Sequence, residues 1–272
     1  MEEKKPFLSI QEFSKLSGIE ASTLRYWDEI GIFTPHLRND ENNYRYYSTE
    51  QLLALNFVTT LSDLEFPLKT IAVLRMERNP DKLLDLLEKQ ERLMDMEMRN
   101  LRNRYSIIHA RRELINMGSK AKESEISVER LDNMDMILWP PNSYSEDDTF
   151  VQPLANYVPQ INDLHINLSF PVGGYYNDLD SFRRAPAKPD RFISLDPRGM
   201  HTRKAGNYLI GYSRGYYGEL GDLPERMAAY AKENSVPLTG PLYLMYLYEE
   251  FSTQDDSQYL AQASVAVSTR RR

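Results

Sequence analysis

The chain of 272 residues contains no cysteine, which excludes disulfide bonds and every metal site built on thiolates. Redox sensing and the sensing of thiophilic metals are therefore excluded. The histidines lie far apart and form neither an H-x-x-H nor an H-x-x-x-H pair, so we expect no metal ion and no other cofactor. They are His36, His109, His165 and His201.

Long apolar runs and catalytic motifs are missing as well. No segment approaches the roughly 18 uninterrupted apolar residues of a membrane span, and Met1–Phe7 lacks the apolar core of a secretory signal. We therefore expect a cytoplasmic protein that does not contact a membrane. There is no G-x-S-x-G nucleophile motif, no cysteine nucleophile and no metal-ligand spacing, so we expect no catalytic residues and no enzymatic activity.

The composition, with 41% hydrophobic and 27% charged residues, is that of an ordinary globular protein, and the length suits two domains. A net charge of -7 counts against nucleic acid as a partner, because neutralising phosphates requires local lysine and arginine. An acidic domain can nevertheless mask a basic surface elsewhere in the chain. The position of the basic residues must decide.

The first residues predict two short helices. Ser9 and Glu12 form a capping-box pattern, which starts a helix that runs to about Leu16. Gly18 supplies the turn, and a second helix spans about residues 20–30 with Gly31 as its stop. The positions expected to be buried are Ile10, Phe13, Leu16, Leu24, Trp27 and Ile30. Two short helices joined by a glycine-containing turn form a helix-turn-helix.

Residues 33–47 contain turn-forming proline and asparagine ahead of an aromatic run, a pattern that predicts a hairpin-like wing. Ser48 and Gln51 give a second capping-box pattern for a further helix. Its expected buried side is Leu52, Leu53, Leu55, Phe57 and Leu61. Pro67 suits the first turn of another short helix that runs to about Leu74.

One long helix is predicted between Pro80 and Met117, where no interior glycine or proline occurs. Apolar residues recur along it at heptad spacing and define an apolar seam, composed of Leu87, Met94, Met98, Leu101, Tyr105, Ile108 and Ile115. A single helix cannot bury such a seam. The alternatives are a helix packed on the core of its own domain and a two-helix coiled coil; the narrow stripe favours the coiled coil.

Beyond Ser124 the pattern changes to short strands, with two intervening helices at about Thr149–Ile161 and Leu223–Asn234. The predicted strands are 126–131, 134–139, 164–170, 191–195, 208–213, 242–248 and 259–267. The sequence therefore predicts an all-helical part followed by an α+β domain with an antiparallel sheet.

The second helix carries the candidate DNA-reading residues Ser22, Thr23, Arg25 and Tyr26. In a helix-turn-helix, the second helix enters the major groove with its N-terminal half. The guanidinium of Arg25 can bind a phosphate or a guanine with two hydrogen bonds. Taken alone, these residues also fit an ordinary helix with a solvated face.

Three segments together resemble the MerR family of transcription regulators, namely Leu8–Gly18, Thr23–Phe33 and Asn43–Ser48. They contain L-R-Y-x-[DE]-x-x-G followed by Y-R-Y-Y-S. The resemblance covers about residues 7–75 and implies a winged helix-turn-helix on a long antiparallel coiled-coil dimerisation helix. It also implies a homodimer that binds palindromic double-stranded promoter DNA and distorts the spacer so that RNA polymerase holoenzyme engages both promoter elements. Tyr44, Arg45 and Tyr46 of the wing would clamp the DNA backbone.

The second half resembles the GyrI-like effector domains of multidrug-binding members of that family. The resemblance rests on 206–208, 215–220 and 238–243. Such domains hold hydrophobic cations in an aromatic pocket, and the residue after the last tyrosine of these motifs is often a buried glutamate that pairs with the cation. Here that residue is Leu244, so we expect either a less charged effector or recognition by aromatic rings.

With a period of two, Leu244, Tyr246, Tyr248 and Glu250 share one face of their strand, and Tyr259 begins the next strand. Tyrosine rings can hold a lipophilic cation by cation-π contacts. The candidate ligand-binding residues are Trp139, Phe170, Tyr208, Leu244, Tyr246, Tyr248 and Tyr259. The alternative is that the tyrosines are ordinary sheet residues.

The predicted domains are a winged helix-turn-helix at 1–78, a coiled-coil dimerisation helix at 79–118 and a GyrI-like effector domain at 119–272. We expect a ligand-responsive regulator that activates transcription when a hydrophobic effector, most simply a drug-like cation, binds. Two alternatives remain open. One is a GyrI-like hydrolase fused to a DNA-binding domain, and the other is a ligand-independent DNA-bending protein.

Overall fold

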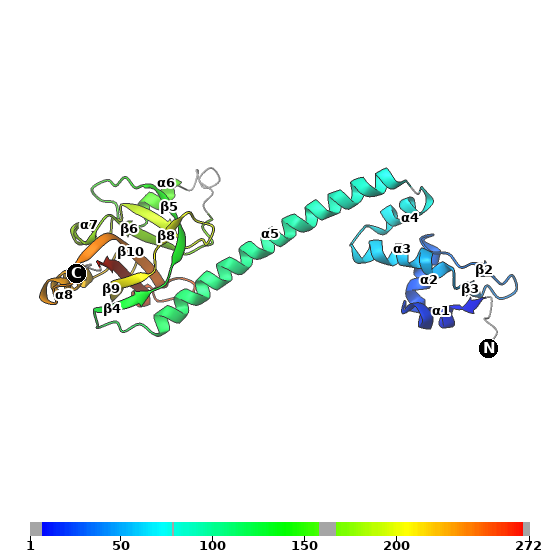
Figure 1. Ribbon diagram of the computed structural model, residues 1–272, viewed down its shortest axis with the longest axis horizontal. Coiled ribbons are helices and arrows are strands. Elements are labelled where there is room, and N and C mark those ends of the chain that lie inside the picture. The colour runs from blue at the N-terminus through cyan, green and yellow to red at the C-terminus, as the bar shows by residue number, and fades with distance from the viewer. Residues whose placement is uncertain (1–6, 78, 158–166, 269–272) are drawn as a thin grey trace. The chain divides into compact units, whose positions relative to one another are not determined.

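The computed structural model describes residues 7–77, 79–157 and 167–268. It divides into two compact units, Met1–Met98 (unit 1) and Arg99–Arg272 (unit 2) (Figure 1). A helix of 40 residues, α5 (Pro80–Ser119), contributes residues to both units. No helix in the described part of the chain is long and apolar enough to cross a membrane.

Unit 1 begins with the predicted helix-turn-helix. Strand β1 (Leu8–Ser9) leads into α1 (Ile10–Ser17), and α2 (Ala21–Glu29) follows. The capping box is confirmed, because Ser9 Oγ accepts from the amide of Glu12 and the amide of Ser9 donates to Glu12 Oε2. Gly18 ends α1 with a φ of 74°, a left-handed conformation that favours glycine.

The wing is confirmed as a small antiparallel sheet with the strand order β1-β3-β2, in which β2 is Leu37–Arg38 and β3 is Arg45–Tyr47. Aromatic side chains pack against the inner side of the wing. The ring of Phe13 of α1 stacks on that of Tyr47 with centroids 4.7 Å apart, and the centroid of the Phe33 ring lies 5.8 Å from that of Tyr47. All three side chains are fully buried. The wing and the first helix therefore share one core.

Helices α3 (Gln51–Asp63) and α4 (Leu68–Met76) complete this core. Three residues that the spacing predicted to be buried are exposed instead, namely Leu16, Ile30 and Leu53. Leu53 is 82% exposed, whereas Leu55, Val58 and Leu61 face the core at helical spacing. Consecutive leucines cannot all face one side of a helix, so the prediction for Leu53 was wrong.

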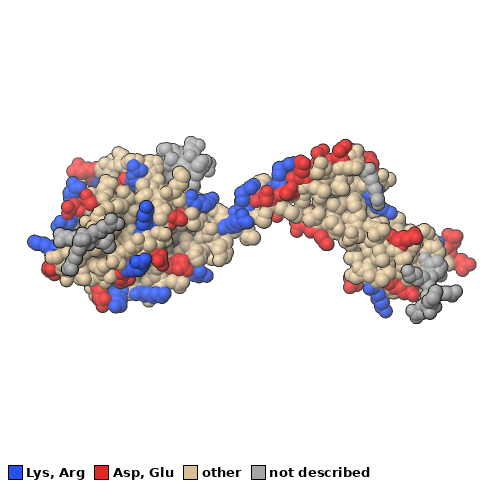
Figure 2. Space-filling model, viewed as in Figure 1, with Lys and Arg blue, Asp and Glu red and all other residues tan. Residues whose placement is uncertain are grey.

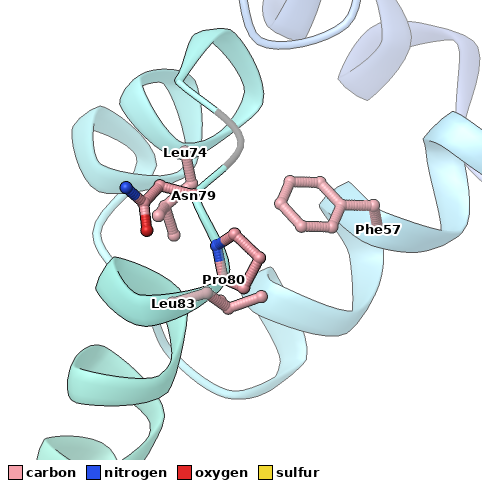
Figure 3. A pocket seen from close by; sticks show the side chains of 5 residues that line it. All are labelled: Phe57, Leu74, Asn79, Pro80 and Leu83. Carbon is pink, nitrogen blue, oxygen red and sulfur yellow. The ribbon is translucent and has the colours of Figure 1, made fainter.

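An apolar hollow lies where α5 begins (Figure 3). Phe57 of α3, Leu74 of α4 and Leu83 of α5 line it together with Asn79 and Pro80. In Figure 3 the ring of Phe57 points toward Pro80 across the hollow. The start of α5 therefore belongs to the core of unit 1.

The apolar seam of α5 has no partner within the described part of unit 2. Leu101 is 68% exposed and Ile108 is 66% exposed, and Tyr105 and Ile115 are exposed as well. By contrast, Leu114 and Gly118 on another side of the helix are buried. The last turns of α5 thus pack on unit 2 by one face and leave the seam open.

Unit 2 is built on an antiparallel sheet of 8 strands with the order β4-β9-β11-β10-β6-β7-β5-β8. The strands are β4 (Ser127–Leu131), β5 (Met134–Pro141), β6 (Val172–Tyr176), β7 (Arg191–Ser194), β8 (His201–Arg203), β9 (Gly206–Arg214), β10 (Leu238–Tyr248) and β11 (Leu260–Val267). The helices are α6 (Gln152–Tyr157), α7 (Leu179–Arg184) and α8 (Leu223–Glu233), with a short 3-10 turn at Asp256–Gln258. This confirms the predicted fold, α followed by α+β.

The sheet buries side chains on both faces. One face, which we call the cavity face, carries a cluster that includes Trp139, Phe192 and Leu244. The other, the helix face, carries a cluster that includes Leu114 of α5 and Met245. Neighbouring residues of β10 therefore belong to different cores, as the alternation of a strand requires.

The predicted strand 164–170 is corrected. Residues 164–166 lie outside the described part of the chain, and residues 167–170 are not a strand. The strand that pairs with β10 here is β6, which includes Gly173. A Cβ at Gly173 would lie 2.3 Å from the carbonyl oxygen of Leu244, so only glycine permits this approach. Because glycine weakens a strand pattern, the sequence placed the strand too early. Strand β8 and helix α7 were not predicted.

Candidate functional site

Helix α2 presents the first candidate site. Leu24 and Trp27 are buried in the core of unit 1, which fixes the orientation of the helix. On the opposite side Ser22, Arg25 and Tyr26 are exposed, and Thr23 is half-buried. The four predicted residues thus form one accessible face. Their contact with DNA remains a prediction.

Asp28 links this helix to the wing. Its carboxylate is fully buried, and Arg38 Nη2 donates to both of its oxygens at 2.7 Å. Arg45 Nε donates to Oδ2 at 2.5 Å. This hydrogen bond raises the pKa of Arg45 above its ordinary value. Arg45 was predicted to contact DNA, and the role of Asp28 was not predicted, although its place within the L-R-Y-x-D motif was a signal.

The other wing residues lie at the surface. Tyr44 is exposed and Tyr46 is half-buried. In Figure 2 the visible face of unit 2 carries acidic and basic side chains side by side, without a broad field of one sign. The contact of the wing residues with the DNA backbone, like that of the α2 residues, remains a prediction.

The second candidate site is a cavity of about 230 Å³ in unit 2, which we call the effector cavity. Its lining combines aromatic and aliphatic side chains with an arginine and two glutamates. The residues are Arg111, Phe150, Val151, Leu154, Leu168, Phe170, Val172, Tyr216, Tyr217, Glu249, Glu250 and Phe251. Of the predicted ligand-binding residues, Phe170 lines the cavity directly.

The predicted residues Trp139, Leu244 and Tyr246 lie in the core of the cavity face and are almost completely buried. Trp139 Nε1 donates to Ser194 Oγ at 2.8 Å, which satisfies the indole. Tyr246 accepts from the amide of Gly218 at 2.7 Å. These side chains support the cavity wall, and they do not line the cavity.

Tyr248 lies on the helix face, so the prediction that it shares a face with Tyr246 was wrong. Tyr208, a candidate from another strand, also lies on the helix face and does not line the cavity. Between β10 and β11 the register shifts: Tyr246 pairs with Ala261, and Tyr248 pairs with Leu260. This β-bulge interrupts the alternation on which the prediction depended.

Tyr217 is the centre of the aromatic wall. Its ring lies 4.5 Å from that of Tyr246, 5.7 Å from that of Phe150 and 5.5 Å from that of the predicted Tyr259. Burial, and then the hydrogen bond to Glu250, raise the pKa of Tyr217 above its ordinary value, so the phenol stays protonated and donates. Tyr217 was not predicted as a ligand-binding residue, although it lies in the Gly215–Leu220 motif that carries the family resemblance.

Two carboxylates, those of Glu249 and Glu250, directly follow β10. Tyr217 donates to Glu250 Oε2 at 2.6 Å and lies 3.2 Å from Glu249 Oε2. Glu249 is 8% exposed, whereas Glu250 is exposed. The cavity therefore combines aromatic rings with negative charge even though Leu244 is apolar.

Arg111 of α5 balances part of this charge. It forms an ion pair with Glu249, and its guanidinium carbon lies 3.8 Å from the centroid of the Phe251 ring. Arg111 Nη2 also donates to the carbonyl oxygen of Ser169 at 3.1 Å. Among the described residues there is no group of three or more histidine, aspartate or glutamate side chains that could hold a metal ion.

Comparisons with known proteins give one family match and several similar proteins. Residues 8–76 match the model of the MerR HTH family regulatory proteins. The "Multidrug-efflux transporter 2 regulator" of Bacillus subtilis is 25% identical over 254 residues, which cover 92% of each chain. The "Multidrug-efflux transporter 1 regulator" of the same organism is 36% identical over 66 residues, 24% of each chain. A solved structure of an "EcmrR-DNA complex" is 15% identical with a TM-score of 0.39, covering 96% of this chain and all of that one.

We predict that Asp28→Asn loosens the wing, because Arg38 and Arg45 lose the buried charge that they share. Charged hydrogen bonds of this kind contribute about 2 kcal/mol. Amides of β2 and β3 should then exchange hydrogen roughly thirtyfold faster, measured by mass spectrometry. The matched control is Glu29→Gln, which alters the exposed neighbouring carboxylate. Equal exchange in Asp28→Asn and the wild type would show that the wing does not depend on Asp28.

Proposed function

We propose, from the match of residues 8–76 to the MerR family of helix-turn-helix regulatory proteins, that the chain is a ligand-responsive transcription regulator. The regulator that is 25% identical over 92% of both chains supports the same function for the whole length. We propose that the chain has three parts, with the bounds predicted from the sequence. They are a DNA-binding domain at residues 1–78, a dimerisation helix at 79–118 and an effector domain at 119–272.

The DNA-binding step rests on α2 and the wing. Ser22, Thr23, Arg25 and Tyr26 would enter the major groove, and Tyr44 and Tyr46 would contact the backbone beside it. In this arrangement Arg45 holds the wing against α2 through Asp28. Its other two nitrogen atoms would donate to a phosphate. Bending and untwisting a promoter spacer costs on the order of 1–6 kcal/mol, which charged phosphate contacts on both half-sites offset.

The proposal that the protein binds an effector depends on one observation. The effector cavity combines an aromatic wall with the carboxylates of Glu249 and Glu250. Aromatic faces and a nearby carboxylate together recognise a hydrophobic cation, because the rings supply apolar contact and cation-π attraction while the carboxylate supplies the counter-charge. Occupation of the cavity would allow the dimer to distort its promoter so that RNA polymerase holoenzyme initiates.

Arg25→Ala should abolish operator binding while the dimer stays intact, because an exposed guanidinium on the reading face is lost without a change in the core. An operator would first be selected from random duplexes with the wild-type protein and then titrated in gel shifts. Lys232→Ala, which removes an exposed cation from α8, is the control. Wild-type affinity of Arg25→Ala would refute the assignment of this residue.

Ile108→Glu should convert the dimer to a monomer. The side chain is 66% exposed in the single chain, and a charge in the middle of a two-helix seam would be buried without a partner. Sedimentation equilibrium measures the change. Arg102→Glu alters an exposed position outside the seam and should leave the dimer intact. A dimeric Ile108→Glu variant would mean that the seam is not the dimer interface.

Tetraphenylphosphonium, a lipophilic cation, should bind the wild-type dimer saturably in a calorimetric titration. Glu250→Gln should weaken this binding about fivefold, since a partly exposed charge pair contributes up to about 1 kcal/mol. The control is Glu233→Gln, an exposed carboxylate on α8. Identical affinities of the wild type and Glu250→Gln would argue against Glu250 as a counter-charge.

A further inference from the structure

The acidic end of the effector cavity already contains a cation, the guanidinium of Arg111. Three contacts hold it there: the ion pair with Glu249, the stacking over Phe251 at 3.8 Å and the hydrogen bond from Nη2 to the carbonyl oxygen of Ser169. A carboxylate together with an aromatic face is the same recognition chemistry that an external organic cation would use. Arg111 and such a cation therefore compete for one position.

The energetics of the pair permit this exchange. The Arg111 side chain is 15% exposed and that of Glu249 is 11% exposed, so both charges have lost most of their hydration. Burial lowers the pKa of Arg111 below its ordinary value. In a buried ion pair the cost of desolvation roughly cancels the attraction, so the pair contributes little net stability. A more weakly hydrated organic cation pays a smaller desolvation cost than the guanidinium at the same carboxylate.

The volume of the cavity also favours displacement of the Arg111 side chain. Its volume of about 230 Å³ is below the roughly 300–1,000 Å³ of pockets that take drug-sized ligands. The Arg111 side chain forms part of the cavity wall. Withdrawal of this long side chain would enlarge the cavity at the end that carries Glu249 and Phe251.

We propose that Arg111 is an internal competitor, and that a cationic effector binds by displacing its guanidinium from Glu249 and Phe251. This inference rests on the proposed function of the cavity as a site for hydrophobic cations. The displacement has a direct consequence for α5. Arg111 contacts the end of β10, and Leu114 and Gly118 beside it are buried against unit 2. Its neighbours on the other side, Ile108 and Ile115, belong to the exposed seam.

Displacing Arg111 thus removes a contact between the dimerisation helix and the end of β10. The coupling is reciprocal: whatever frees Arg111 from Glu249 raises the affinity for the cation, and the cation in turn weakens the attachment of α5 at this point. The effector shifts the equilibrium only by its preference for the protein with Arg111 displaced.

The test is the affinity of the full-length dimer for tetraphenylphosphonium, measured by calorimetry. Arg111→Met keeps an unbranched side chain but removes the charge, so it should tighten binding at least tenfold. Arg112→Met, an exposed neighbour on the same turn of α5, should bind like the wild type. Adding Glu249→Gln to Arg111→Met should abolish the gain, because the gain comes from the freed carboxylate.

Each other result overturns the inference in a distinguishable way. If the wild type binds the cation and Arg111→Met binds it equally or more weakly, Arg111 is a structural residue and the proposed function stands. If neither protein binds tetraphenylphosphonium, the cavity takes no lipophilic cation, and both the cation site and the displacement of Arg111 are refuted. The proposal of DNA binding is unaffected, because gel shifts test it independently. Should Arg111→Met fail to fold, Arg111→Lys replaces it. The more strongly hydrated ammonium should be a poorer competitor, and affinity unchanged from the wild type would contradict the proposal.

Discussion

An apolar stripe on a long helix is stable only when another surface buries it, and a single helix cannot bury its own apolar seam. Its seam is exposed at Leu101 and Ile108 within unit 2, although neighbouring residues on another face are buried. One helix therefore has two surfaces, a face that packs on unit 2 and an open face that the proposed dimer would cover. This division places Arg111 and Gly118 against the sheet. A Cβ at Gly118 would lie 2.5 Å from the ring of Tyr248, so this packing is close.

Local signals explain why unit 1 was predictable from the sequence. The cap at Ser9, the left-handed turn at Gly18 and the buried pair Leu24 and Trp27 act within a few residues of one another, and the structure has each of them. The exposure of Leu53 was not predictable from composition alone, since a run of leucines does not say which of them faces the core. Burial there depends on the angle at which α3 packs.

The effector cavity was less predictable, because its residues come together through long-range pairing. A strand pattern with period two places Tyr246 and Tyr248 together, whereas the bulge between β10 and β11 separates them. Tyr217, Glu249 and Arg111 come from three separate segments, and only the folded chain brings them to one cavity. The sequence could predict an aromatic domain, but it could not predict which rings line the cavity.

The position of the counter-charge has a physical consequence of its own. A glutamate at the position of Leu244 would lie in the fully buried core, where an ionised carboxylate without a cation is prohibitively costly. At the end of β10 the carboxylates lie between the core and the surface: Glu249 is buried, and Glu250 is exposed. A carboxylate as buried as that of Glu249 requires a charged partner. In the structure this partner is the guanidinium of Arg111.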